Sequence, residues 1–250
     1  MSAEPRREIG HLIRREVAAN NGDGFFREPL VGFARADDPL FGEILRRVGP
    51  HHLRPADILP EGRTVVSFFL PFTDKVVSGN RGPGPVSRDW GLSYLAANVL
   101  INRINGLVID LVTAAGGTAA SVPATHTFDE KTLQAGWSHR SAALVAGLGR
   151  FGLNRMLIGP SGAAGRYGTV FISPEIDPDP RPEDEPCLYF KSGRCQACVR
   201  ACPVEALTTE SFDGHKCYAH VLENSEFLDL DGRLCDVCGK CVVAGPCAII

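Results

Sequence analysis

The chain has 250 residues and a formal net charge of −3, and it is 44% hydrophobic and 22% charged. This length allows one large or two modest domains, each with a buried core. The balanced charge excludes a general electrostatic attraction to nucleic acid or to anionic membranes. No apolar segment follows the arginine pair near the amino terminus, and no run approaches the ~20 apolar residues of a membrane span. We therefore expect a cytoplasmic protein that needs no membrane.

Helix and strand patterns alternate over the first two thirds of the chain. In chain order we predict a helix over 4–20, a strand over 30–34, a helix from Asp38-Pro39, a strand over 64–70, a helix over 88–115, a strand over 118–122, a helix from Ser138 to Leu148 and a strand over 167–172. Glycine-rich sequences end the first and the longest helix. This interleaving predicts a layered α/β arrangement of the α+β class.

A domain boundary is predicted at 173–186. Five prolines and six acidic residues lie in these fourteen positions. Proline lacks a backbone N–H donor, so this density excludes both a helix and a central strand. We place one domain at 1–178, for a cofactor or a partner, and a second at 179–250.

All nine cysteines lie beyond residue 186. The run Cys-Gln-Ala-Cys-Val-Arg-Ala-Cys-Pro at 195–203 is typical of the second half of a bacterial ferredoxin ligand motif, in which the cysteine before proline binds a second cluster. Two [4Fe–4S] cubanes need eight thiolates, which leaves one cysteine over. Structural zinc also uses Cys-x2-Cys pairs, but it does not call for the added Cys-Pro. A disulfide framework suits a short secreted chain better than this one.

A second motif lies before the cysteines. The sequence Ala-Gly-Leu-Gly-Arg-Phe-Gly-Leu-Asn at 146–154 follows Ser-His-Arg at 138–140 and precedes Gly-Arg-Tyr-Gly-Thr-Val-Phe at 165–171. Together with the cysteine module, this order resembles the epoxyqueuosine reductase family and its reductive dehalogenase relatives. The resemblance covers residues 138–250. It implies a nitroreductase-like N-terminal domain that holds a corrinoid, and a ferredoxin-like domain whose two [4Fe–4S] clusters supply electrons.

The resemblance also suggests site residues. It places the cofactor near Gly147, Gly149, Gly152 and Asn154, and it makes His139 and Arg140 candidates for catalysis. A histidine there could donate a proton, and an arginine could pair with an anionic group. The alternative is structural: the glycines supply a tight turn, and the two polar residues cap a helix at the surface. The family's proposed proton donor, an aspartate, is not transferred, because Asp129 has a different spacing.

The cluster ligands follow from the same resemblance. One cluster is assigned Cys187, Cys195, Cys198 and Cys247, and the other Cys202, Cys217, Cys238 and Cys241. Cys235 is left as the spare cysteine. An alternative uses Cys235 in a triplet with Cys238 and Cys241, and it frees Cys217. Ser192 stands where a full first run would have cysteine, so Cys187 must reach the cluster from a longer loop.

Two functions remain open from the sequence. The first is an iron–sulfur oxidoreductase that relays electrons to a corrinoid, or to a flavin, for an unknown substrate. The second is a ferredoxin-like electron carrier whose N-terminal domain only docks a partner. In either case the expected partner is a redox protein or a small-molecule acceptor.

Overall fold

The computed structural model describes residues 3–124 and 128–249. The helices are α1 (Ala3–Ala19), α2 (Pro39–Val48), α3 (Pro55–Ile58), α4 (Asp74–Gly79), α5 (Arg88–Ala114), α6 (His139–Val145), α7 (Leu188–Ser192), α8 (Ala197–Arg200), α9 (Gly214–Leu228), α10 (Lys240–Val243) and the 3-10 helix η1 (Pro246–Ala248). The strands are β1 (Leu30–Arg35), β2 (Thr64–Pro71), β3 (Ala119–Ser121), β4 (Phe128–Asp129), β5 (Gln134–Ala135), β6 (Arg150–Phe151), β7 (Leu157–Ile158) and β8 (Gly165–Ile172).

A four-stranded antiparallel sheet in the order β1-β2-β8-β3 forms the centre of the molecule. All of β2 is buried, which explains why its sequence is an almost unbroken apolar run. In the register, Val66 of β2 lies between Phe33 of β1 and Val170 of β8. The expected strands at 30–34, 64–70, 118–122 and 167–172 are all present, with no end shifted by more than two residues.

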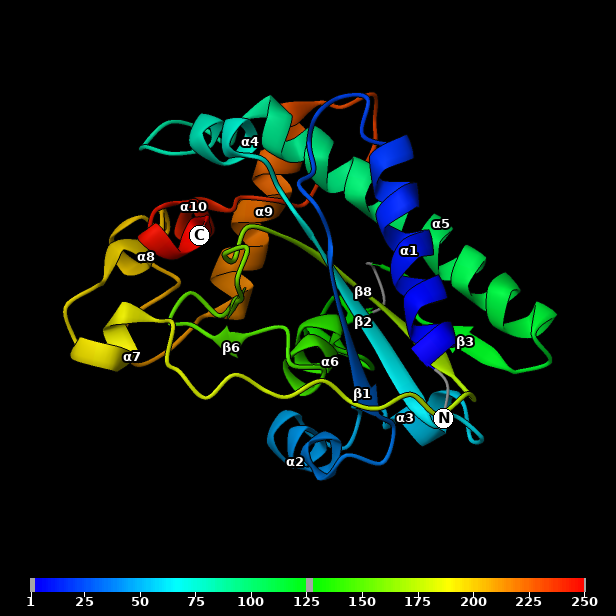
Figure 1. The fold of residues 1–250 in the computed structure, drawn as a ribbon. Coiled ribbons are helices and arrows are strands. Elements are labelled where there is room, and N and C mark those ends of the chain that lie inside the picture. The colour runs from blue at the N-terminus through cyan, green and yellow to red at the C-terminus, as the bar shows by residue number, and fades with distance from the viewer. Residues whose placement is uncertain (1–2, 125–127, 250) are drawn as a thin grey trace.

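Helices cover both faces of this sheet (Figure 1). Helix α5 packs on β8 and carries α1 beside it, while α6 contacts β2 and β8 from the other face and has α2 next to it. Ile101, Ile104 and Val108 of α5 are fully buried. The arrangement is a mixed α/β fold compatible with the predicted α+β class.

Helix α5 is also long and apolar enough to cross a membrane by length and composition, which the sequence reading did not anticipate. Its most apolar 18-residue window has a mean hydropathy of 1.4, and 44% of that window is buried inside the protein. Packing against the sheet accounts for this apolar content, as in the core helix of a globular protein.

The proline-rich segment forms neither helix nor strand, as expected, but it is firmly attached to the sheet. The Asp179 carboxylate accepts hydrogen bonds from the Phe33 backbone at 2.9 Å and from Arg6 at 3.0 Å. Arg181 forms an ion pair with Asp38 at 2.7 Å. One hydrophobic cluster contains residues from both sides of this segment. The division into 1–178 and 179–250 stays a prediction.

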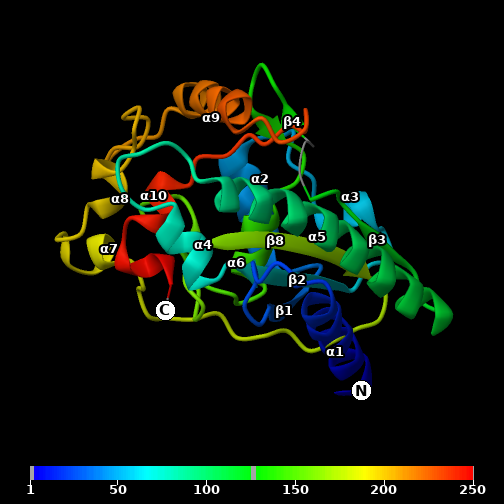
Figure 2. The ribbon, with the colours of Figure 1, turned by 90° about the horizontal axis from the view of Figure 1, so that it is seen from above.

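The cysteine-bearing segment gathers at the end of the sheet opposite β3, as both views show (Figures 1 and 2). Three of its helices, α7, α8 and α10, have only four or five residues. Upstream, Ser138 caps α6 as predicted by accepting a hydrogen bond from the Ser141 backbone, but α6 ends at Val145 and not at Leu148. Gly147 has φ +78°, a left-handed conformation that stops the helix.

Candidate functional site

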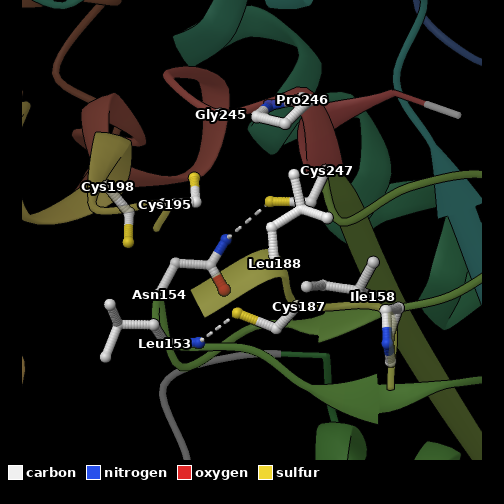
Figure 3. A pocket seen from close by; sticks show the side chains of 11 residues that line it. Leu153, Asn154, Ile158, Cys187, Leu188, Cys195, Cys198, Gly245, Pro246 and Cys247 are labelled. Atoms are coloured by element: carbon white, nitrogen blue, oxygen red, sulfur yellow. Dashed lines mark hydrogen bonds between the residues drawn. The ribbon is translucent and has the colours of Figure 1, made fainter. Parts of the chain in front are cut away.

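Four thiol groups line one cavity of about 200 Å³ at the cysteine-bearing end (Figure 3). They belong to Cys187, Cys195, Cys198 and Cys247, which is the set assigned to one cluster from the sequence. Cys187 lies directly before α7, and Cys198 lies within α8. These short helices turn the backbone so that cysteines separated along the chain face a shared space.

Nitrogen donors from the glycine-rich motif reach the same thiols. The Leu153 backbone N–H donates to the Cys187 sulfur at 3.4 Å, and the Asn154 side-chain amide points at the Cys247 sulfur at 3.9 Å (Figure 3). The Asn154 side-chain oxygen accepts from the Met156 backbone at 3.1 Å, which fixes the orientation of the amide. Hydrogen bonds to sulfur are one of the factors that set cluster potentials.

The second group consists of Cys202, Cys217, Cys238 and Cys241. Burial first, and then the nearby thiols of Cys238, Cys217 and Cys202, together raise the pKa of Cys241 to about 12. Burial also raises the pKa of Cys217 to about 11, with added contributions from Cys238 and Cys202. The Cys202 sulfur accepts a hydrogen bond from the Ala206 backbone at 3.2 Å. Cys198 lies in α8 and Cys241 in α10, and these two helices contact each other, so the two groups are neighbours.

Cys235 lies apart from both groups. It is fully buried, and its thiol points at the Gly91 carbonyl oxygen of α5 at 3.5 Å. Burial raises its pKa to about 11, and no other cysteine contributes to that shift. Ser192 also lies away from the cavity, since it is exposed and donates to the Leu188 carbonyl oxygen at 2.8 Å. The structure therefore groups Cys217, and neither Cys235 nor Ser192, with the remaining thiols.

The donor set fits [4Fe–4S] clusters better than a single ion. Within residues 3–124 and 128–249, no three His, Cys, Asp or Glu side chains are placed to hold one metal ion. Each group instead offers four thiols, which is the ligand number of a cubane, and the described lining of the first cavity adds no imidazole or carboxylate. Burial raises the pKa of five of these thiols, so iron would bind there with release of protons; the five are Cys198, Cys217, Cys238, Cys241 and Cys247.

The glycines of the 146–154 motif allow other backbone segments to pack closely against them. A Cβ atom on Gly147 would lie 2.5 Å from the Pro180 carbonyl oxygen. A Cβ atom on Gly149, which has φ +156°, would lie 2.3 Å from the Ile158 carbonyl oxygen. Gly152 lines a cavity of about 700 Å³, whereas Asn154 is buried at the cysteine cavity. Their binding of a corrinoid or flavin stays a prediction.

A separate cavity of about 580 Å³ lies between the sheet, α6 and the β4–β5 hairpin. It is lined by Val48, His51, His52, Ala124, Phe128, Leu133, Gln134, Ala135, Trp137, Ser138, His139, Arg140, Met156, Gly165, Arg166 and Tyr167. It adjoins the 700 Å³ cavity, because Val48, Ser138 and Arg140 line both. Both sequence candidates for catalysis therefore reach this cavity.

The ring nitrogens of His139 both contact protein groups. Nε2 lies 3.0 Å from the Pro123 carbonyl oxygen, which can only accept, so Nε2 carries the proton and Nδ1 accepts from the Thr169 hydroxyl at 2.9 Å. Burial lowers the pKa of His139 to about 4, so the ring is neutral at pH 7. This bonding favours a positioning role, and proton donation by His139 stays a prediction.

Arg140 and Arg166 bring positive charge to the wall of the cavity. Arg140 donates to the Arg155 carbonyl oxygen at 2.9 Å, and the Cys241 thiol is close enough to influence its pKa. Arg166 donates to the Asn98 side-chain oxygen at 2.9 Å and lies 4.4 Å from the Tyr94 ring centroid. The cavity therefore borders the second cysteine group.

Sequence reasoning missed Arg166 and Trp137. The signal for Arg166 was available, because a charged residue inside an apolar strand pattern is unusual unless it serves a site. No comparable signal marked Trp137, since tryptophan is an ordinary core residue. Asp129 is the last residue of β4, and its carboxylate accepts hydrogen bonds from the turn that follows, from the Thr132 backbone at 2.7 Å and the Lys131 backbone at 3.0 Å. It acts as a turn cap there.

Solved structures share this fold. The chain resembles epoxyqueuosine reductase from Streptococcus thermophilus with a TM-score of 0.57 and 18% identity, over 94% of this chain and 64% of that one. The values for the enzyme from Bacillus subtilis are 0.56 and 17%, over 95% and 65%. A reductive dehalogenase described in connection with B12-dependent dehalogenation gives 0.54 and 18%, over 75% and 26%. The sequence itself matches no protein-family model and no curated protein.

These comparisons confirm, at the level of fold, the resemblance drawn from the sequence motifs. The chain spans about 65% of the length of the epoxyqueuosine reductases that it matches. At 17–19% identity the likeness defines a fold shared with these two groups of reductases, and activity must be argued from the site.

Proposed function

We propose that the protein is an iron–sulfur oxidoreductase that relays electrons through two [4Fe–4S] clusters to a corrinoid, or to a flavin, in the 580 Å³ cavity. The observation that carries the proposal is the continuity of three sites. The first thiol group neighbours the second because Cys198 and Cys241 lie on the contacting helices α8 and α10, and the Cys241 thiol is close enough to Arg140 on the cavity wall to influence its pKa. Such adjacency is what a chain of single-electron transfers requires.

The residues of the cavity suit a large ligand rich in hydrogen-bond acceptors. Two adjoining cavities of about 580 and 700 Å³ meet at Arg140. Arg140 and Arg166 offer guanidinium donors, and Tyr167 and Trp137 offer aromatic surface. A corrinoid or a flavin would supply the redox chemistry, and the protein would orient it and shield it from water.

The thiols would hold the clusters in the two groups described above. Leu153, Asn154 and Ala206 would donate hydrogen bonds toward the cluster sulfurs. In this proposal, residues 179–250 form a ferredoxin-like domain and residues 1–178 a nitroreductase-like domain. The location would be the cytoplasm, where a reducing environment keeps the thiols available. The similar reductases lead us to expect a reduction, and the substrate remains to be identified.

An absorption experiment tests the proposal. Protein purified without oxygen should show broad iron–sulfur absorption that bleaches with dithionite. Added cobalamin or flavin should bind at about micromolar concentration, near −8 kcal/mol, and should speed re-oxidation of the reduced clusters. If neither cofactor binds and re-oxidation is unchanged, the protein is better described as a ferredoxin-like carrier whose N-terminal region docks a partner.

A further inference from the structure

The charge on the wall of the 580 Å³ cavity is unbalanced. Of the described residues that line it, two are arginines and three are histidines, while none is an aspartate or a glutamate. Packing around the Arg140 side chain lowers the pKa of Arg140, and the nearby Arg166 guanidinium lowers it further. Two positive charges close together in a cavity repel each other, and a bound anion would offset this repulsion.

Arg140 carries the excess charge. It donates through Nη1 to the Arg155 carbonyl oxygen at 2.9 Å and to the Met156 sulfur at 3.4 Å, and neither partner is charged. The described groups that shift its pKa include no carboxylate. A guanidinium has five N–H donors in a planar fork, so Arg140 has donors to spare for a ligand. Its side chain is exposed to solvent where it opens onto the cavity.

Arg166 differs from Arg140, because its charge is partly balanced. Asp236 raises its pKa, and the guanidinium lies over the Tyr94 ring at 4.4 Å from the centroid. Its Nη2 donates to the Asn98 side-chain oxygen at 2.9 Å and to the Ala124 carbonyl oxygen at 3.3 Å. Arg166 is therefore fixed by its protein partners, while Arg140 is the arginine that has free N–H donors to bind a ligand.

Two further groups on the same wall have unused hydrogen-bonding capacity. His52 is 4% exposed and Trp137 is 3% exposed, and their ring centroids lie 5.6 Å apart. Neither ring nitrogen of His52 has a partner among the described residues, and the same holds for Nε1 of Trp137. The indole nitrogen can only donate, and burial lowers the pKa of His52, so the ring is neutral and keeps one donor. Protein encloses these nitrogen atoms, so they shape the wall, and Arg140 is the group that is open to a ligand.

We infer that the 580 Å³ cavity contains an oxyanion-binding subsite, in which Arg140 grips a phosphate or carboxylate group of the ligand that occupies the cavity. The inference deepens the proposed function, since it concerns the same cavity. The oxyanion belongs either to the cofactor, as a phosphodiester, or to the substrate.

Isothermal titration calorimetry of the intact anaerobic protein in phosphate-free buffer tests the subsite, with inorganic phosphate and benzoate as probes. At least one probe should bind saturably, with a Kd of about 1 mM or below. Arg140→Gln should weaken that binding at least tenfold. The matched control is Arg47→Gln, because Arg47 lines only the adjoining cavity, and its Kd should be unchanged.

Saturable binding by neither probe, or equal binding by wild type and Arg140→Gln, overturns the inference. If Arg140→Gln fails to fold, the same titration of Arg140→Lys tests the subsite instead. Lysine keeps the charge but loses the planar fork, so binding should weaken at least threefold, and an unchanged Kd contradicts the subsite.

Repeating the titration with cobalamin present separates the two sources. Loss of oxyanion binding assigns the subsite to the cofactor's phosphodiester, and retained binding assigns it to the substrate; both outcomes support the subsite. The result is also separable from the proposed relay. If the protein binds phosphate but neither cobalamin nor flavin, the subsite is supported and the proposed electron relay is contradicted. If it binds cobalamin but no oxyanion, the relay is supported and the subsite is contradicted.

Discussion

The sheet region and the cysteine-bearing segment are built on different principles. The sheet region has long elements, such as the 27-residue α5 and two eight-residue strands, which bury large apolar side chains against one another. The segment after residue 186 has three helices of four or five residues and several exposed apolar residues, including Phe190 at 53% and Phe227 at 62%. Hydrophobic burial is extensive in the first region, whereas the second adds a smaller set of side chains, such as Leu228 and Val243, to the shared core. We propose that the clusters supply additional order in the second region.

The largest expected effect comes from removing iron. Because metal binding and folding are coupled in cysteine-rich modules, a chelator under reducing conditions should lower amide-exchange protection in α9 (Gly214–Leu228) about a hundredfold, roughly 2.7 kcal/mol. Strands β2 and β8 should keep their protection. Hydrogen exchange followed by mass spectrometry measures both regions in one sample. Equal loss in both would mean that the regions form one cooperative unit.

A core substitution should show the opposite pattern. Ile104→Ala removes a fully buried side chain from α5 and should cost about 2–5 kcal/mol in the free energy of unfolding. Val99→Ala on the same helix, where Val99 is 71% exposed, should cost less than about 0.5 kcal/mol. Denaturant unfolding measures the difference, and iron per folded chain should be unchanged in both variants. Iron loss in Ile104→Ala alone would show that the sheet supports the clusters directly.

The buried His139 predicts a pH dependence of the sheet region. Its pKa is lowered to about 4, below the usual 6.5. Between these two pH values the unfolded state binds a proton at His139 and the folded state does not. Stability should therefore be unaffected above about pH 6.5 and should fall by up to about 2 kcal/mol as the pH drops toward 4. His139→Asn should flatten this slope in thermal unfolding measured across that range. His11→Asn, at an exposed position, is the control, and a slope unchanged in His139→Asn would contradict the account.

The smallest expected effect concerns the contact between the two regions. Asn154 directs its amide at the Cys247 sulfur at 3.9 Å. A donor near sulfur stabilises the more negative reduced cluster, so Asn154→Leu should lower the potential of one cluster by about 40 mV, roughly 1 kcal/mol for one electron. A redox titration followed by electron paramagnetic resonance measures both clusters, and the second serves as an internal reference. A shift in the second cluster alone would contradict the thiol grouping.

Most of the sheet region was predictable, because its apolar periodicity is local information. Helix α2 begins at Pro39 behind the Asp38 cap, and α5 ends just before Gly116, both as the sequence indicates. The end of α6, which is at Val145, was placed too late, although Gly147 is a local stop signal: its left-handed backbone ends the helix, and the close approach of Pro180 leaves no room for a side chain there.

The candidate site was predictable in part. The family resemblance predicted two groups of four thiols, and the structure places the thiols of the first group around one cavity. Cluster binding by either group stays a prediction. They could not show that Asn154 faces a thiol cavity, or that Arg166 and Arg140 converge on another cavity. Those relations arise only when β8, α6 and the cysteine segment pack together, and no local pattern encodes that packing.

The most direct test of the central claim is the iron and sulfide content of three proteins purified without oxygen. Eight thiols in two groups predict about eight irons and eight sulfides per wild-type chain. Cys198→Ser should retain about four of each, and Cys235→Ser should retain all eight, because Cys235 lies against α5 and apart from both groups. Stoichiometric zinc, about four irons in the wild type, or loss of a cluster in Cys235→Ser would contradict the account.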